Sequence, residues 1–235
     1  MLIINLIRHG KTLGNLSSKM IGRTDEPLCG EGILEAREMI VPRADLWIIS
    51  PMKRCVQTAD ILRDNTADTE SPCIFERDFR ECDFGHFENR NYIEMAEDEE
   101  YRAWIRSGGH MSFPGGEDPA CFQERCCRAF SVILAACEGR PDKSMPQAAA
   151  IVKIRPKDQE CFRVNMVVHG GTIMSIMDRF AASEDGRKRT YYDWAVPNLG
   201  GYVLLSDESQ NIPEKLTVLT QDDKPVSPVK RKDTV

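Results

Sequence analysis

The feature that most constrains this chain is an apolar run that ends in charged and polar residues. Residues 2–7 read Leu-Ile-Ile-Asn-Leu-Ile and lead directly into the Arg-His-Gly of residues 8–10. Such a run predicts a buried strand, and strands of open α/β sheets deliver ligand-binding residues to their carboxyl edge. A second run, 164–168, leads into the His-Gly-Gly of 169–171. We therefore expect two strands to bring a histidine and a glycine to the same edge.

The rest of the sequence alternates between strand-like and helix-like patterns. Strand-like runs follow at 46–49, 73–75, 201–205 and 216–219, and helix-like runs at 31–40, 52–62, 92–105, 120–138 and 172–180. This alternation implies parallel strands joined by crossover helices. It predicts the α/β fold class.

One helix start carries a specific signal. Ser50 and Pro51 follow the strand-like run 46–49, and they predict a helix with Ser50 as its N-cap and Pro51 as its first residue. Arg54 would then lie in the first turn, close to the edge where the preceding strand ends. Helix N-termini attract phosphate, so this arrangement indicates an anion site.

The region before His169 contains two strand-like runs, 148–154 and 161–168, around a turn at 155–158. One of them must be the strand that precedes His169. The other predicts an added hairpin, which would lie within an insertion at about 143–163. We expect residues 1–220 to form a single domain and residues 221–235 to be a disordered tail.

Length and charge limit the classes of function. A chain of 235 residues with 41% apolar residues suits one sizeable globular domain. Its net charge of -6 argues against general nucleic-acid binding. No apolar run approaches the roughly 20 residues of a membrane span, and residues 2–7 do not form a signal sequence. We expect a cytoplasmic protein without nucleic-acid or membrane partners, and a homodimer is compatible with the sequence.

The nine cysteines are odd in number and scattered, which favours reduced thiols over a disulfide framework. There is no C-x-x-C pair, and the clustered Cys121, Cys126 and Cys127 have no nearby histidine. A zinc site is therefore not expected. We predict neither a metal nor a cofactor.

Residues 10–12, Gly-Lys-Thr, could end a nucleotide-binding P-loop. That loop needs a glycine five positions before Gly10, where Asn5 stands inside the predicted strand, and it needs a helix directly after Thr12. The P-loop is therefore rejected. The remaining interpretation is that Arg8 and His9 share an anion, because a guanidinium binds phosphate and a neutral imidazole can attack phosphorus.

Attack on an anionic phosphoester requires further positive groups and a proton for the leaving oxygen. Arg54 and His169 are candidates for the positive groups, and Gly170 could offer a backbone amide. Residues 80–85 supply two carboxyl groups, Glu81 and Asp83. A partly desolvated carboxyl there could stay protonated and act as the acid.

Several segments together resemble the histidine phosphatase (phosphoglycerate-mutase-like) superfamily. They are residues 8–10, Asn15, 22–28, 50–59, 81–85, 113–117, 169–171 and 196–198, and they occur in the family's order over most of the chain. The resemblance implies that His9 is the nucleophile that becomes phosphohistidine. Glu81 would be the general acid that protonates the leaving oxygen and then activates water. The phosphate pocket would consist of Arg8, Asn15, Thr24, Arg54, His169 and Gly170.

Some residues keep two interpretations. Asp83 is the rival acid, but we expect it to cap the turn that follows it. Glu117 either structures its loop or contacts substrate. His86 and His110 are expected in solvent or at the rim of the substrate site, and not as catalysts. Lys11 stands where the family often has Glu or Gln.

The resemblance implies one three-layer α/β/α domain with a mostly parallel sheet and a small helical cap at about 87–119. About 30 residues separate Glu81 from the segment 114–117, a spacing similar to small phosphatases such as α-ribazole phosphatase. We therefore predict hydrolysis of a small phosphorylated metabolite. The alternatives are a phosphoglycerate mutase primed by a bisphosphate and a phospho-ligand-binding protein on the same fold.

Overall fold

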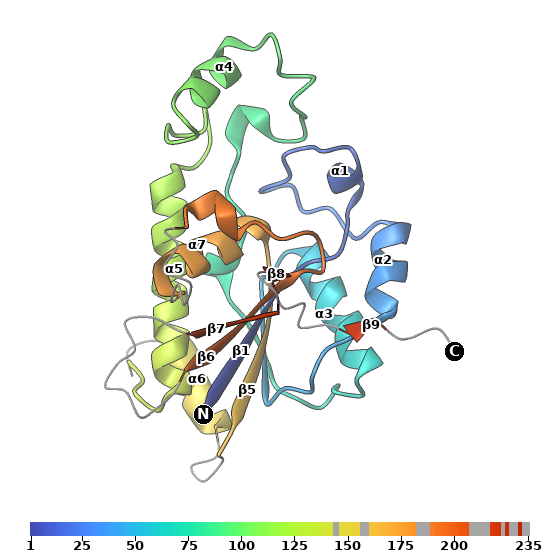
Figure 1. Cartoon of the computed structure of the whole chain (residues 1–235), viewed down its shortest axis with the longest axis vertical. Coiled ribbons are helices and arrows are strands. Elements are labelled where there is room, and N and C mark those ends of the chain that lie inside the picture. Colours follow the sequence, from blue (N-terminus) through green and yellow to red (C-terminus); the bar gives the residue numbers. More distant parts are fainter. Residues whose placement is uncertain are drawn as a thin grey trace.

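Figure 1 shows the chain as a computed structural model. The structure describes residues 1–142, 146–155, 160–181 and 189–206, together with the backbone of 217–221, 224–225 and 230–231. Within these residues, no helix combines the length and the apolar character needed to cross a membrane.

The central sheet has the strand order β4-β3-β5-β1-β6-β7-β8. The first four strands of this order are parallel, and β6, β7 and β8 run antiparallel to their neighbours. The strands are β1 (Leu2–Arg8), β3 (Leu46–Ile49), β4 (Cys73–Phe75), β5 (Phe162–Val168), β6 (Gly201–Ser206), β7 (Thr217–Gln221) and β8 (Lys224–Pro225).

The register of β1 against β5 sets the position of the two histidines. Arg8 pairs with Val168, so His9 and His169 leave the sheet side by side at its carboxyl edge. Asn5, the polar residue inside the apolar run, pairs with Asn165, and its amide donates to the Asn165 Oδ1 atom at 2.5 Å. Because both amides are buried, a slipped register would leave polar groups without partners.

Helices cover both faces of the sheet (Figure 1). One core cluster joins the sheet to α5 (Pro119–Cys137), α6 (Pro146–Ile154) and α7 (Gly170–Phe180). A second cluster joins the other face to α2 (Gly30–Arg37) and α3 (Lys53–Asn65). The predicted three-layer α/β/α arrangement with a mostly parallel sheet is confirmed.

The segment predicted as a cap, 87–119, lies beyond the carboxyl edge of the sheet. It contains α4 (Glu99–Arg106) and follows two short 3-10 helices, η1 (Arg77–Phe79) and η2 (Gly85–Phe87). Its own core contains Phe87, Met95 and Phe113, which pack with Phe122 of α5. The short α1 (Leu13–Leu16) and the 3-10 helix η3 (Tyr191–Trp194) also lie near this edge (Figure 1).

Several expected elements differ in the structure. Residues 148–154 belong to α6 and are not a strand, so the predicted hairpin is wrong. Three consecutive alanines favour a helix, and Ala148 and Ile151 are the buried residues of this helix. Residues 143–145 and 156–159 of the predicted insertion lie outside the described residues.

The boundaries of two other helices also differ from expectation. α2 ends at Arg37, and Met39–Ile40 forms a short strand, β2, paired with β9 (Lys230–Arg231). α4 begins at Glu99, seven residues later than the predicted start, with Asp98 as its N-cap. In contrast to the predicted disordered tail at 221–235, five of its residues lie in the strands β7, β8 and β9, at 221, 224–225 and 230–231; the rest of 221–235 lies outside the described residues.

Candidate active site

Two histidines face each other at the carboxyl edge of the sheet. The ring centroids of His9 and His169 are 5.2 Å apart, and the rings meet edge to face. Both side chains are buried. The site therefore has the paired His-Gly strand ends that the sequence predicts.

The hydrogen bonds of His9 determine its tautomer. Its Nδ1 atom lies 2.7 Å from the carbonyl oxygen of Gly10. Because a carbonyl oxygen can only accept, Nδ1 carries the proton, and Nε2 has a free lone pair. The loop is fixed on both sides, since the Gly10 amide donates to Thr58 Oγ1 at 3.0 Å and Asn198 donates to the His9 carbonyl at 3.0 Å.

His169 is held in the other tautomer. Arg54 Nε donates to its Nδ1 atom at 3.3 Å, so Nδ1 has no proton. The proton is then on Nε2, which lies 2.8 Å from Ser50 Oγ and donates to it. Both ring nitrogens of His169 are therefore engaged by neighbouring side chains.

Arg54 is a fully buried cation among neutral partners. Besides His169, its guanidinium donates to the carbonyl oxygens of Thr24 at 2.8 Å, Gly22 at 3.0 Å and Ile21 at 3.4 Å. None of these groups carries a compensating negative charge. The charge of Arg54 is therefore available to attract an anion.

Arg8 is the second buried cation. Its Nη1 atom donates to the Val196 carbonyl at 2.7 Å, whereas its Nε atom is buried without a hydrogen-bond partner in the described part of the chain. Burial lowers the pKa of Arg8, and the charge of Glu81 acts in the opposite direction. A Cβ built on Gly170 would lie 3.4 Å from Arg8 Nε, so the backbone of Gly170 lies close to this unpaired donor.

The surroundings keep both histidines neutral. Burial lowers the pKa of His9 well below its ordinary value of 6.5, and the nearby charge of Arg54 lowers it further. The pKa of His169 is lowered by the same two causes. At neutral pH, His9 therefore has an unprotonated nitrogen and can act as a nucleophile.

The environment of Glu81 suits a proton donor. Its carboxyl oxygens accept from the backbone amides of Cys82 at 3.0 Å and Gly171 at 3.3 Å. Burial raises the pKa of Glu81 above its ordinary value of 4.5. The rival carboxyl, Asp83, instead accepts from the Gly85 amide at 2.9 Å, so it caps the turn as expected.

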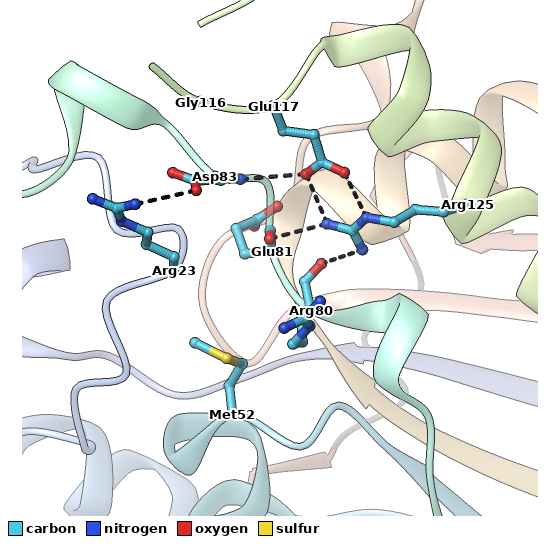
Figure 2. A pocket seen from close by; sticks show the side chains of 8 residues that line it. All are labelled: Arg23, Met52, Arg80, Glu81, Asp83, Gly116, Glu117 and Arg125. Atoms are coloured by element: carbon cyan, nitrogen blue, oxygen red, sulfur yellow. Dashed lines mark hydrogen bonds and ion pairs between the residues drawn. The ribbon is translucent and has the colours of Figure 1, made fainter. Parts of the chain in front are cut away.

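Two cavities meet at Glu81. The larger has a volume of about 560 Å³, and the smaller one, of about 370 Å³, is shown in Figure 2. The predicted site residues that line the larger cavity are Arg8, His9, Asn15, Glu81 and Gly170. Much of its remaining wall is aromatic and comprises Phe84, Trp104, Phe113, Phe122, Tyr191 and Tyr192.

Three predicted phosphate-pocket residues have other positions or partners. Arg54 and His169 do not line either cavity and are completely buried. The hydroxyl of Thr24 donates to Glu88 Oε2 at 2.8 Å, and only its carbonyl reaches the site, as an acceptor for Arg54. The structure thus gives Thr24 the role of holding Arg54 in place.

For some of the residues with two interpretations, the structure distinguishes between them. Lys11 forms ion pairs with Glu31 and Glu35 of α2 and does not line the cavities. His110 lines the larger cavity, and His86 lies 2.9 Å from Glu100 at an exposed position. Glu117 structures its loop, as described below. In the described part of the chain, no three His, Cys, Asp or Glu side chains gather in the way that a metal ion would need.

The roles of two residues, Ser50 and Glu88, were not predicted from the sequence. Ser50 is not the N-cap of α3, which begins at Lys53 with Met52 in that position; its hydroxyl instead fixes the tautomer of His169. Glu88 accepts hydrogen bonds from the amides of Arg23 at 2.7 Å and Gly22 at 3.2 Å. It thereby shapes the loop whose carbonyls hold Arg54, a role for which no local sequence signal exists.

Comparison with known proteins places these observations in a family. A family model described as histidine phosphatase superfamily (branch 1) matches residues 4–216. Two sequence relatives, both named "Probable phosphoglycerate mutase GpmB", come from Escherichia coli O1:K1 / APEC and Enterobacter sp. (strain 638). They are 28% and 30% identical to the chain over 152 residues, which cover 62% of this chain and 67% of each relative.

Solved structures show the same fold. The α-ribazole phosphatase from Shigella flexneri is 18% identical, with a TM-score of 0.67 over 95% of this chain and 98% of that chain. A phosphoglycerate mutase from Thermus thermophilus is 22% identical, with a TM-score of 0.57 over 94% of this chain and 99% of that chain. Since the family model covers most of the sequence, this chain belongs to the histidine phosphatase superfamily (branch 1).

Proposed function

We propose that this protein hydrolyses phosphomonoesters through a phosphohistidine formed on His9. The observation that carries the proposal is the free Nε2 lone pair of a neutral, buried His9 beside two guanidinium groups, Arg8 and Arg54, whose hydrogen-bond partners are neutral. An anionic phosphoryl group would supply the missing negative charge. It would also satisfy the unpaired Nε of Arg8.

In the first step, the Nε2 lone pair of His9 attacks phosphorus while the bond from phosphorus to the ester oxygen breaks. Glu81 gives its proton to that oxygen, and the alcohol leaves. The phosphorylated imidazole keeps its Nδ1 proton, which the Gly10 carbonyl accepts. Arg8 and Arg54 stabilise the charge on the transferring group, which is the main requirement of phosphoryl transfer.

In the second step, the Glu81 carboxylate takes a proton from a water molecule, and the oxygen of this water attacks phosphorus. The N–P bond breaks, inorganic phosphate leaves, and His9 returns to its neutral form. Glu81 thus ends the cycle protonated, as it began. A raised pKa suits both roles, because the group must give up and regain one proton in each turnover.

The large cavity beside His9 supports a phosphatase acting on a sizeable alcohol. Its volume of about 560 Å³ is in the range of sites for drug-sized ligands. Trp104 and Phe113 stack there with their ring centroids 5.1 Å apart. Such walls suit an alcohol with a planar ring better than a three-carbon acid, so we propose a small metabolite of the α-ribazole phosphate kind as substrate.

The test is to incubate the protein with a panel of phosphomonoesters and to measure phosphate release. The panel contains α-ribazole phosphate, nucleoside monophosphates, sugar phosphates, phosphoamino acids and 3-phosphoglycerate. We expect the ring-bearing esters to have the highest kcat/KM. Rapid quenching at alkaline pH should trap a phosphoprotein that is labile to acid, and absence of this species during turnover would contradict the proposal.

The names of the sequence relatives support mutase activity as a second candidate. A mutase would be primed by 2,3-bisphosphoglycerate and would then interconvert phosphoglycerates with little release of phosphate. We expect instead that water accepts the phosphoryl group. Interconversion that is faster than hydrolysis would favour the mutase.

A further inference from the structure

Arg125 on α5 makes an unusual set of contacts with the segment that carries Glu81. Its Nε and Nη2 atoms form a two-pronged ion pair with Glu117, at 2.7 Å and 2.9 Å. The two side chains are largely buried, with 16% and 21% of their surfaces exposed. Glu117 therefore neutralises Arg125 and fixes the plane of its guanidinium.

The remaining donors of Arg125 point to main-chain oxygens. Nη1 donates to the carbonyls of Asp78 at 2.6 Å and Arg80 at 2.8 Å, and Nη2 donates to the carbonyl of Glu81 at 3.2 Å. Figure 2 shows Arg125 between Glu117 and the carbonyls of Arg80 and Glu81. A single side chain thus binds three carbonyls within four consecutive residues.

These contacts matter because residues 80–84 belong to no helix or strand. The carboxyl of Glu81 is held by the amides of Cys82 and Gly171, but its main chain has no ladder of regular hydrogen bonds to fix it. Glu117 extends the support, since it also accepts from the Asp83 amide at 3.3 Å. Arg125 and Glu117 therefore hold the main chain of the segment that carries the Glu81 carboxyl.

We propose that Arg125, locked by Glu117, is a positioning residue that holds Glu81 where it can protonate the leaving oxygen. This inference rests on the proposed function, since it takes Glu81 as the general acid. Arg125 does not touch the reacting atoms. Its planar fork is suited to bridging a carboxylate and three carbonyls, which a lysine ammonium cannot do at once.

The experiment compares two esters that differ in their need for an acid. p-Nitrophenyl phosphate has a leaving group that departs as an anion, whereas an alkyl phosphate needs a proton on its oxygen. The measured quantity is kcat/KM, which reports the steps up to formation of phosphohistidine. For Arg125→Gln, we expect kcat/KM to fall about 10- to 100-fold with the alkyl ester and less than about 3-fold with p-nitrophenyl phosphate.

Two further variants make the test independent of folding. Arg125→Lys keeps the positive charge and should show the same split between substrates with a smaller alkyl-ester loss. Arg128→Gln is the matched control, because Arg128 lies on the same helix, is exposed and binds the side chain of Asp78 at 3.1 Å. It should leave both kcat/KM values unchanged.

Glu81→Gln separates failure of this inference from failure of the proposed function. Glu81→Gln should itself show the split, meaning a larger loss of kcat/KM with the alkyl ester than with p-nitrophenyl phosphate. If it does, and the Arg125 variants lower kcat/KM equally for both esters, Arg125 is merely structural and the inference is overturned. If Glu81→Gln itself shows no split, Glu81 is not the acid and the proposed function is wrong in that respect. A split of the same kind in all the Glu81 and Arg125 variants supports both.

Discussion

The ends of β1 and β5 have the same local pattern, a buried strand followed by histidine and glycine, but their histidines are in opposite tautomers. His9 donates from Nδ1 to the adjacent Gly10 carbonyl and keeps an unprotonated Nε2. His169 accepts at Nδ1 from Arg54 and donates from Nε2 to Ser50. Local sequence is therefore not enough to predict which tautomer each histidine adopts.

The difference comes from neighbours that are distant in sequence. Ser50 and Arg54 flank the start of α3, more than 100 positions before His169, and both turn toward His169. Near His9, Thr58 accepts from the amide of Gly10 and Asn198 donates to the carbonyl of His9, and neither binds the imidazole. The two imidazoles therefore differ in which ring nitrogen carries the proton.

The largest expected effect comes from replacing His9 or His169, which tests directly whether the two histidines have different roles. His9→Ala should lower kcat by about 10⁴-fold or more and abolish the phosphoprotein, because it removes the nucleophile. His169→Ala should lower kcat by about 10²- to 10³-fold, since it removes a supporting group, while phosphohistidine still forms slowly. Phosphate release and quench trapping measure both. Equal losses, with no phosphoprotein in either variant, would contradict the assignment.

The glycines after His169 provide the next contrast. A Cβ at residue 171 would lie 2.5 Å from Glu81 Oε1 and 2.9 Å from the Phe122 ring, whereas at residue 170 the nearest atom is 3.4 Å away. Gly171→Ala should therefore displace Glu81 and lower kcat/KM for an alkyl ester about 10- to 100-fold. Gly170→Ala should cost much less.

Gly30→Ala is the control for these substitutions, because a Cβ there would meet nothing within 4 Å. Melting temperature is measured alongside activity for all three variants. If Gly170→Ala were as inactive as Gly171→Ala while both remained folded, crowding of Glu81 would not be the cause.

The pH profile tests the different states of His9 and Glu81. His9 must be neutral to attack, so kcat/KM should rise as pH increases through its lowered pKa, below 6.5. Glu81 must be protonated, so kcat/KM should fall as pH increases through its raised pKa, above 4.5. Each limb changes activity about tenfold per pH unit.

Glu81→Gln should remove the alkaline limb for an alkyl ester and leave the acid limb in place. Ionisation of the substrate is common to both proteins, so the difference between their profiles isolates Glu81. An unchanged alkaline limb would show that another group sets it.

The smallest effect concerns the tautomer of His169. Ser50→Ala removes the acceptor of its Nε2 proton, and one lost hydrogen bond of about 1 kcal/mol corresponds to a roughly fivefold lower kcat. Cys55→Ala is a suitable comparison, because the Cys55 thiol is also close to His169, with its sulfur 3.5 Å from Nε2. A thiol is a much weaker partner, so its loss should matter less. A Ser50→Ala variant with full activity would show that Ser50 does not tune the site.

Much of the site was predictable because its parts carry strong local signals. The apolar runs predict β1 and β5, and helix periodicity predicts α3 and α5. The order of the motifs then predicts that Arg8, Arg54, Glu81 and His169 meet at one edge. Asp83 was also expected as a turn cap, since an aspartate before a turn commonly accepts from a backbone amide of that turn.

The errors arose where local patterns have more than one solution. Ser50 before Pro51 is a good N-cap signal. In the structure, however, the hydroxyl of Ser50 binds the buried His169 and does not cap the helix. Residues 148–154 are apolar enough for a strand, yet packing against α5 stabilises them as a helix. Thr24 lies in a recognisable motif, but its hydroxyl is turned to Glu88.

The fold class, the family and the residues proposed to react can be predicted from the sequence alone, because they depend on patterns of neighbours along the chain. Three features appear only in the packed fold: the tautomer of His169, the neutral surroundings of Arg54 and the contact of Arg125 with the segment that carries Glu81. These depend on hydrogen bonds between residues tens to more than a hundred positions apart. A donor or acceptor finds its partner only after the layers have packed, and burial then gives each contact its strength.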